Sequence, residues 1–213
     1  MSEPGTHAFE VLSTEDKYVG RIIAVRLDQV AMPGGGKAGR EVVEHLGAVA
    51  IVALDEEEQV TLIHQYRHPL ARRIWELPAG LIDQAGEDPV ETARRELVEE
   101  VGLAAGDWSV LVDVAVSPGF TDEAVRVYLA TDLTTVDRVV EGDEEADLVA
   151  RRFPLDEAVR MALAGEIVNG TAVAGLLAAK AVRTAALRPR PADAPWRDLP
   201  TRLPNRQAGE QGD

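Results

Sequence analysis

The chain contains no cysteine and few aromatic residues. Among its 213 residues, the absence of cysteine excludes disulfide bridges, cysteine-ligated zinc, iron–sulfur clusters and a thiol nucleophile. Phe, Trp and Tyr make up 4% of the chain, so the core must come mainly from the Ala, Val, Leu and Ile among its 46% hydrophobic residues. A chain of this length fits one main domain with an appendage, or a main domain with a smaller one.

Long apolar runs and a recognisable targeting segment are also missing. The N-terminal sequence MSEPGTHAFE lacks the basic and apolar regions of a signal peptide. The best apolar run, residues 48–54, is far shorter than the ~20 residues that span a bilayer. A longer stretch near the C-terminus is interrupted by Lys180 and Arg183. We therefore expect a soluble cytoplasmic protein with no membrane association.

Positive charge is scarce relative to negative charge. The formal net charge of −15 argues against non-specific binding to nucleic acid or to anionic membranes. A small anionic substrate remains compatible with this charge if a metal ion neutralises the site. Residues 141–147, EGDEEAD, hold five carboxylates, and such a run is either a solvated loop or part of a site.

The hydrophobic pattern divides the chain into three parts. Residues 1–46 are typical of strands around a glycine-rich turn, PGGGKAG, which lacks the GxxxxGK[ST] spacing of a phosphate-binding loop. Residues 47–187 hold several apolar strands and helices expected at 155–166 and 171–187, without the strict alternation of a doubly wound sheet. This pattern predicts an α/β protein of the α+β kind with a mixed sheet. Residues 188–213 are rich in Pro, Arg and polar residues, which predicts partial disorder, although Trp196 is expected to dock.

The segment DPVETARRELVEEVG carries clear helix-boundary signals. Asp88 fits the N-cap position, Pro89 fits the first helical position, and Glu91 completes a capping box. Gly102 is a natural C-terminal stop. We therefore expect a helix over residues 89–101.

This expected helix gathers three carboxylates beside its apolar stripe. At ~100° per residue, Glu96, Glu99 and Glu100 occupy a sector ~100° wide next to the stripe of Val90, Ala93, Leu97 and Val101. Like charges at this spacing repel, and the repulsion grows where the dielectric constant is lower. The cluster is either a solvated acidic face or a site for a hard divalent cation such as Mg²⁺.

The surrounding residues resemble the Nudix box of the Nudix hydrolases. Arg95-Glu96-Leu97, Glu99-Glu100 and Gly102-Leu103 stand at the family's spacing, and Glu87 precedes Arg95 with the required seven residues between them. Six residues separate Gly80 from Glu87 where the family pattern has five, and the extra residue falls in the loop DQAG. The resemblance implies an α/β/α sandwich with a small N-terminal β-segment. It also implies that Glu96, Glu99 and Glu100 bind Mg²⁺ or Mn²⁺, with the carbonyl of Ala79 as a further ligand.

Residues outside the box are similar to those of the ADP-ribose pyrophosphatase subfamily. Pro118 lies 15 residues after Leu103, within a similar loop SPGFTDE at 117–123, and residues 8–46 resemble the subfamily's small domain. The resemblance implies a homodimer with exchanged N-terminal segments that hydrolyses ADP-ribose to AMP and ribose 5-phosphate. Two alternatives remain open: a pyrophosphatase for another nucleotide sugar or dinucleotide, and a non-catalytic nucleotide-binding regulator.

The resemblance also implies roles for individual residues. Arg67 is expected to contact a phosphate, Arg40 to enter the adenine pocket of the neighbouring chain, and Glu123 to reach the terminal ribose from a loop of the partner chain. Surface ion pairs for the two arginines and a turn position for Glu123 are the alternatives. Similar enzymes place the catalytic base in the loop that holds EGDEEADL here. Within that loop, Glu145 is the expected base and Glu144 the second choice.

Overall fold

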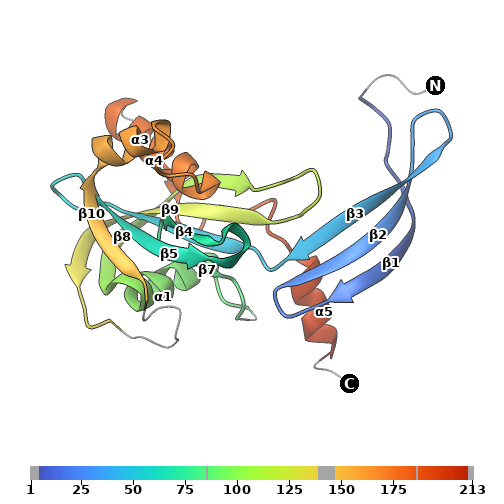
Figure 1. The fold of residues 1–213 in the computed structure, drawn as a ribbon, viewed down its shortest axis with the longest axis horizontal. Helices are drawn as coiled ribbons and strands as arrows, with labels where there is room; N and C mark the ends of the chain where they lie inside the picture. The colour runs from blue at the N-terminus through green and yellow to red at the C-terminus, as the bar shows by residue number, and fades with distance from the viewer. Residues whose placement is uncertain (1–4, 85, 139–146, 186, 211–213) are drawn as a thin grey trace. The chain divides into compact units, whose positions relative to one another are not determined.

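The structure is a computed structural model that describes residues 5–84, 86–138, 147–185 and 187–210 (Figure 1). The chain forms two compact units. The first unit comprises residues 1–47, 115–123 and 198–213, and the second comprises residues 48–114 and 124–197.

The first unit is a three-stranded antiparallel sheet with one helix. The strand order is β1-β2-β3, formed by β1 (Val11–Val19), β2 (Ile23–Ala31) and β3 (Lys37–His45). The predicted turn at PGGGKAG joins β2 to β3, and Gly34 and Gly35 supply the positive φ angles of 93° and 86° that this turn needs. Helix α5 (Arg202–Glu210) contacts β3 and buries Leu203 completely.

The contact between α5 and the sheet contains buried charges. Glu44 on β3 is fully buried, and it pairs with Arg26 from β2 and with Arg206 from α5, whose Nε lies 2.7 Å from Glu44 Oε2. Arg206 also bonds the carboxylate of Asp16 on β1, at 2.8 Å from its Nη1. Burial alone would raise the pKa of Glu44, but the hydrogen bonds from Arg206 and Arg26 bring it below its usual value. The tail helix therefore supplies countercharge to the sheet.

The loop at 117–123 is held against β3. The Val43 amide donates to the Phe120 carbonyl at 2.8 Å, and the His45 amide donates to Asp122 Oδ1 at 2.9 Å. The turn inside the loop is closed by the Thr121 amide, which donates to the Ser117 carbonyl at 3.1 Å. These bonds fix the course of the loop in which Glu123 lies.

The second unit contains two sheets. One has the order β10-β5-β6 and the other β11-β8-β9-β4-β7. In the larger sheet β4 runs parallel to β9 and antiparallel to β7, so this sheet is mixed. The strands are β4 (Ala48–Ala53), β5 (Gln59–Arg67), β6 (Arg72–Glu76), β7 (Ala79–Leu81), β8 (Leu103–Ala115), β9 (Ala124–Thr135), β10 (Val149–Pro154) and β11 (Arg190–Pro191). The helices are η1 (His68–Leu70), α1 (Pro89–Val101), α3 (Leu155–Leu163) and α4 (Gly170–Ala185).

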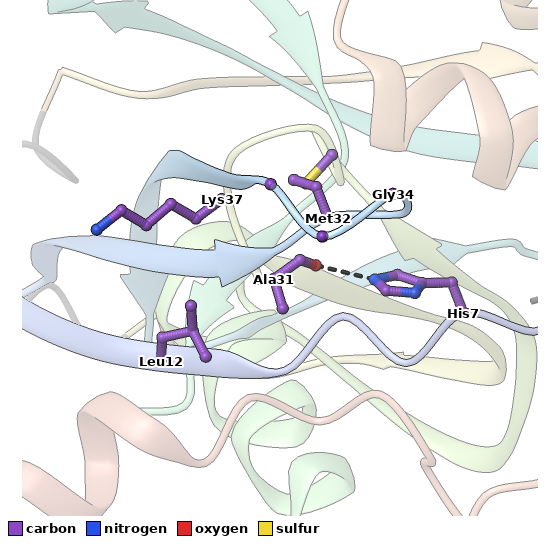
Figure 2. Close-up of a pocket in the computed structure, with 8 residues that line it drawn as sticks. His7, Leu12, Ala31, Met32, Gly34 and Lys37 are labelled. Carbon is purple, nitrogen blue, oxygen red and sulfur yellow. Dashed lines mark hydrogen bonds between the residues drawn. The ribbon is translucent and has the colours of Figure 1, made fainter. Parts of the chain in front are cut away.

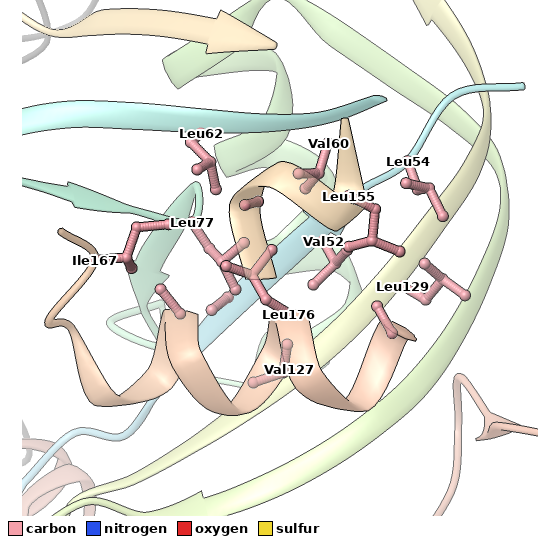
Figure 3. Packing of buried hydrophobic residues seen from close by; sticks show 14 of the residues in the cluster. Val52, Leu54, Val60, Leu62, Leu77, Val127, Leu129, Leu155, Ile167 and Leu176 are labelled. Atoms are coloured by element: carbon pink, nitrogen blue, oxygen red, sulfur yellow. The ribbon is translucent and has the colours of Figure 1, made fainter. Parts of the chain in front are cut away.

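Strand β4 is buried on both faces, because helices cover both sides of its sheet. Ala50, Val52 and Leu54 face a core shared with α3 and α4 (Figure 3). Val49, Ile51 and Ala53 face a second core shared with α1. The continuous apolar run at 48–54 is what a strand between two layers requires. This arrangement confirms the predicted α+β class with helices on both faces of a mixed sheet.

The segment after Arg188, for which composition predicts partial disorder, contributes to both units. In the second unit β11 pairs with β8, and the Trp196 ring lies over the guanidinium of Arg126 at 4.8 Å, so Trp196 docks as expected. Arg126 is buried, bonds Asp113 at 2.8 Å and donates to the Ala194 carbonyl at 2.6 Å. In the first unit the same tail forms α5. Composition does not reveal these contacts, since they depend on partners far away in sequence.

No helix in the described ranges combines the length and the apolar composition that crossing a membrane would require.

Candidate active site

Helix α1 begins and ends where its local sequence predicts. Asp88 Oδ1 accepts a hydrogen bond from the Val90 amide at 3.1 Å, and Gly102 adopts a left-handed conformation with φ 64°. The Gly102 amide donates to the Val98 carbonyl at 3.0 Å, which closes the last turn. The Glu91 carboxylate lies 3.3 Å from Arg94 Nε. The predicted helix at 89–101 is therefore confirmed, and its rotation is set by the buried Ala93 and Leu97.

The short strand β7 lies beside the acidic side of α1. A Cβ atom at Gly80 would stand 2.0 Å from Cδ of Glu96 and 2.1 Å from its Oε1, so the Glu96 carboxylate lies directly over the Gly80 backbone. Only glycine leaves room for this approach. Burial raises the pKa of Glu96 to about 7, with Arg95 opposing the shift and Glu99 adding to it.

Glu100 is the most buried of the three predicted metal ligands. Its side chain reaches β7, where the Ala79 amide donates to Glu100 Oε2 at 2.8 Å. Only 7% of the residue is exposed. Burial raises the pKa of Glu100 to about 8, against the opposing effect of the Ala79 hydrogen bond. A charged carboxylate here is costly unless a cation compensates for it.

Arg95 supplies positive charge to the other two predicted ligands, Glu96 and Glu99. Its Nη1 lies 2.8 Å from Glu96 Oε1 and 3.1 Å from Glu99 Oε2, so one guanidinium joins two of the predicted ligands. Its Nη2 lies 3.4 Å from Glu87 Oε2, and Glu87 also accepts a bond from the Thr92 hydroxyl at 2.8 Å. The arginine and the first glutamate of the box therefore fasten the preceding loop to the helix.

The donor set fits a hard divalent cation, although the carboxylates do not converge on one point. In the ranges that the structure describes, no three His, Cys, Asp or Glu side chains are arranged to hold a metal ion. The available donors are carboxylate oxygens beside the β7 backbone, which is the ligand type that Mg²⁺ and Mn²⁺ prefer. Burial raises the pKa of Glu96 and of Glu100, so their charged forms are disfavoured on this side of α1. A cation bound there would favour the charged forms.

Arg67 lies at the end of β5, next to a buried carboxylate that sequence reasoning missed. Its Nε and Nη2 lie 2.9 Å and 2.8 Å from Glu76 Oε2, while 45% of its side chain remains exposed. Glu76 also accepts bonds from Gln65 and Asn169, each at 2.7 Å. The only sequence signal for this cluster is a glutamate within the otherwise apolar stretch IWELPAG.

The other predicted site residues belong to the first unit or lie outside the described residues. Arg40 is an exposed residue of β3 in the first unit, where its Nη1 donates to the Gly39 carbonyl at 3.0 Å. Glu123 also belongs to the first unit, and its amide donates to the Thr121 hydroxyl at 3.0 Å. Glu144 and Glu145 lie outside the described residues.

A separate hollow in the first unit offers different chemistry. It is formed at the glycine-rich turn between β2 and β3, where His7 Nε2 lies 3.0 Å from the Ala31 carbonyl and Lys37 supplies a positive charge (Figure 2). No Asp or Glu lines this hollow within the described part of the chain. The carboxylates of α1, rather than this hollow, therefore make the candidate active site.

Comparison with known proteins gives consistent results. The NUDIX domain family matches residues 44–174. The chain is 55% identical over 202 residues to the ADP-ribose pyrophosphatase of Mycobacterium tuberculosis, covering 95% of this chain and 98% of that protein. It is 38% identical over 151 residues to the methanol dehydrogenase activator of Bacillus methanolicus, covering 71% of this chain and 81% of that protein. A crystal structure of an ADP compounds hydrolase shares the fold, with a TM-score of 0.75 and 23% identity over 86% of this chain and 98% of that one.

Proposed function

The chain belongs to the Nudix hydrolase family, and on this premise we propose that it hydrolyses the pyrophosphate bond of ADP-ribose to give AMP and ribose 5-phosphate. The observation that carries the proposal is the 55% identity, over 95% of the chain, to an ADP-ribose pyrophosphatase. The carboxylates of the box, which a protein that only binds nucleotides would not need, are all present.

We propose that Glu96, Glu99 and Glu100 hold Mg²⁺ or Mn²⁺, with the Ala79 carbonyl as a further ligand. Two observations support this set: burial raises the pKa values of Glu96 and Glu100, and both side chains meet the backbone of β7. A divalent cation bound there would stabilise negative charge that develops on the phosphate oxygens.

The chain's own side chains would do the remaining work. Arg67 would bind a phosphate oxygen through a charge-assisted hydrogen bond. Glu145, or Glu144 in its place, would accept the proton of the attacking water. This role falls to a further carboxylate because a glutamate bound to a metal ion has its basic lone pairs occupied.

We further propose a homodimer in which each chain completes its neighbour's site. Arg40 would contribute to the adenine pocket of the neighbouring chain, and Glu123 would reach its terminal ribose. Every residue of β1 is exposed, including Leu12 at 52% and Tyr18 at 58%, which suits a strand that another chain covers. The expected cytoplasmic location stays a prediction from sequence.

A substrate panel tests the proposed activity. Purified protein would be assayed against ADP-ribose, other nucleotide sugars and dinucleotides, with Mg²⁺, with Mn²⁺ and with a chelator. The expected result is the highest kcat/KM for ADP-ribose, no turnover with chelator, and AMP and ribose 5-phosphate as products. A higher kcat/KM for another nucleotide would change the substrate. Binding without turnover under every metal condition would favour a regulator.

A further inference from the structure

Glu76 is a buried carboxylate at the centre of a small hydrogen-bond network. It ends β6 and is only 3% exposed. Its Oε1 accepts from Asn169 Nδ2 at 2.7 Å. Its Oε2 accepts from Gln65 Nε2 at 2.7 Å and from Arg67 Nε at 2.9 Å. Both oxygens are therefore engaged, and a fixed anion faces the guanidinium of Arg67.

Asn169 uses both ends of its amide group. Its Oδ1 accepts from the Ala172 amide at 2.8 Å, which caps the first turn of α4. Its Nδ2 is the donor to Glu76, a residue 93 positions away in sequence. The start of α4 is thereby tied to the end of β6, and the orientation of the Glu76 carboxylate depends on this helix.

The network also determines which edge of the Arg67 guanidinium is presented. A guanidinium carries five N–H groups in a rigid plane. Glu76 takes the edge formed by Nε and Nη2, so the Nη1 edge is directed away from it. The Arg67 side chain is 45% exposed, and without this anchor it would sample many rotamers and lose that freedom on binding a ligand.

We propose that Glu76 and Asn169 are positioning residues for Arg67. Asn169 holds the Glu76 carboxylate, and Glu76 holds the guanidinium so that its Nη1 edge meets a phosphate oxygen of the substrate. The inference rests on the proposed function, in which Arg67 binds a phosphate. It assigns a role in substrate binding to a residue of the α3–α4 connection, far in sequence from the box.

Two substitutions separate this role from helix capping. Asn169→Ser keeps a side-chain oxygen that can cap α4, because serine is as good an N-cap as asparagine, but its short side chain cannot reach Glu76. Asn169→Ala removes both interactions. The chain's other asparagine, Asn205, is an exposed residue of α5, so Asn205→Ser is a matched control.

The expected result is a rise in KM for ADP-ribose of roughly tenfold in both Asn169 variants, with kcat within about threefold of the wild type. The melting temperature should fall in both variants, because both leave Glu76 Oε1 without this donor, and it should fall further in Asn169→Ala, which also loses the helix cap. In an Arg67→Ala background, Asn169→Ser should raise KM no further, because it acts through Arg67. If Asn169→Ser kept the wild-type KM and only Asn169→Ala were impaired, Asn169 would be a helix cap and the proposal would be overturned.

A measurement without substrate distinguishes failure of this inference from failure of the proposed function. The Arg67 Nε–H signal in a proton–nitrogen NMR spectrum, assigned by its loss in Arg67→Lys, reports the bond to Glu76. Its exchange with water should speed up at least about tenfold in Asn169→Ser and stay unchanged in Asn205→Ser. Unchanged exchange in Asn169→Ser would overturn the network whatever the substrate is. The other outcome is that the wild-type protein fails to hydrolyse ADP-ribose while exchange is still faster in Asn169→Ser. That result would overturn the proposed substrate and leave the hydrogen-bond network in place.

Discussion

At the scale of single residues, the site depends on how closely the β7 backbone approaches two glutamates. Gly80 has no positive φ that would require glycine, so the reason for glycine there is the Glu96 carboxylate above it. The atoms that a new Cβ would meet belong to the far end of a flexible side chain. An added methyl group would therefore move the carboxylate rather than break the strand.

Gly80→Ala should consequently lower activity more than stability. Displacing Glu96 should weaken divalent-cation binding, and we expect kcat/KM to fall at least about tenfold, while the free energy of unfolding changes by less than about 1 kcal/mol. Enzyme assays over a Mg²⁺ titration and urea unfolding would measure the two effects. Gly36→Ala, whose Cβ would enter open space, serves as the control. A large loss of stability with normal cation dependence would contradict this reading of Gly80.

The raised pKa values of Glu96 and Glu100 predict how stability depends on pH without a divalent cation. Both values, about 7 and about 8, lie above the ordinary glutamate value of 4.5, so the folded chain binds more protons than the unfolded chain in this range. The contribution of these two carboxyl groups to the free energy of unfolding is fully present below pH 4.5 and is lost as the pH rises through 7 and 8. With chelator present, the free energy of unfolding should fall by several kcal/mol between pH 5 and pH 9, with about 7 kcal/mol as the upper limit that the two pKa values allow.

Chemical unfolding at several pH values would test this dependence. Mg²⁺ should stabilise the protein more at pH 9 than at pH 6, because only the ionised carboxylates bind it. Glu100→Gln should flatten the pH dependence in chelator and reduce the effect of Mg²⁺. A wild-type stability that is level from pH 5 to pH 9 would show that these carboxylates titrate normally.

At the scale of secondary-structure elements, the sequence predicts features that local signals determine and does not predict features that depend on distant contacts. The ends of α1 could be predicted because Asp88 and Gly102 act on their own helix. Its three glutamates could be predicted to lie together because helical spacing alone puts them on one side of the helix. Helix α5 could not be predicted, because among its described side chains it buries only Leu203, and it pairs through Arg206 with Glu44, 162 residues away. The bond between Asn169 and Glu76 was missed for the same reason: nothing near either residue indicates the other.

Arg206→Ala should destabilise the first unit although it lies in a polar tail. Its removal would leave the fully buried Glu44 with one fewer countercharge, and breaking a buried ion pair typically costs about 3–5 kcal/mol. We expect a loss of at least about 2 kcal/mol in the free energy of unfolding at pH 7, measured in urea, since 28% of the Arg206 side chain is exposed. Arg188→Ala, at an exposed position of the same tail, should change it by less than about 0.5 kcal/mol. Equal effects of the two substitutions would mean that α5 does not stabilise the sheet.

At the scale of the whole molecule, the chain passes repeatedly between its two units. The first unit draws on residues 1–47, 115–123 and 198–213, and the predicted substrate residues divide accordingly. Arg67 and the box carboxylates belong to the second unit, while Arg40 and Glu123 belong to the first. The resemblance places Arg40 and Glu123 in the site of a neighbouring chain, and this prediction can be tested without any structure of the dimer.

Mixing two inactive variants tests whether each site draws residues from both chains. Arg40→Ala should impair the adenine contact and Glu100→Gln the cation site, so each homodimer should have little activity. In a mixed dimer, one site would combine the intact carboxylates of the Arg40→Ala chain with the intact Arg40 of the other chain. After subunit exchange at equal concentrations, half of the dimers are mixed and each has one complete site, so about one quarter of wild-type activity should return.

Two controls accompany this test. Light scattering should show a dimer throughout. A mixture of Glu96→Gln with Glu100→Gln, two changes in the same half of the site, should recover no activity. Activity equal to the mean of the separate variants would mean that Arg40 serves its own chain or no site at all.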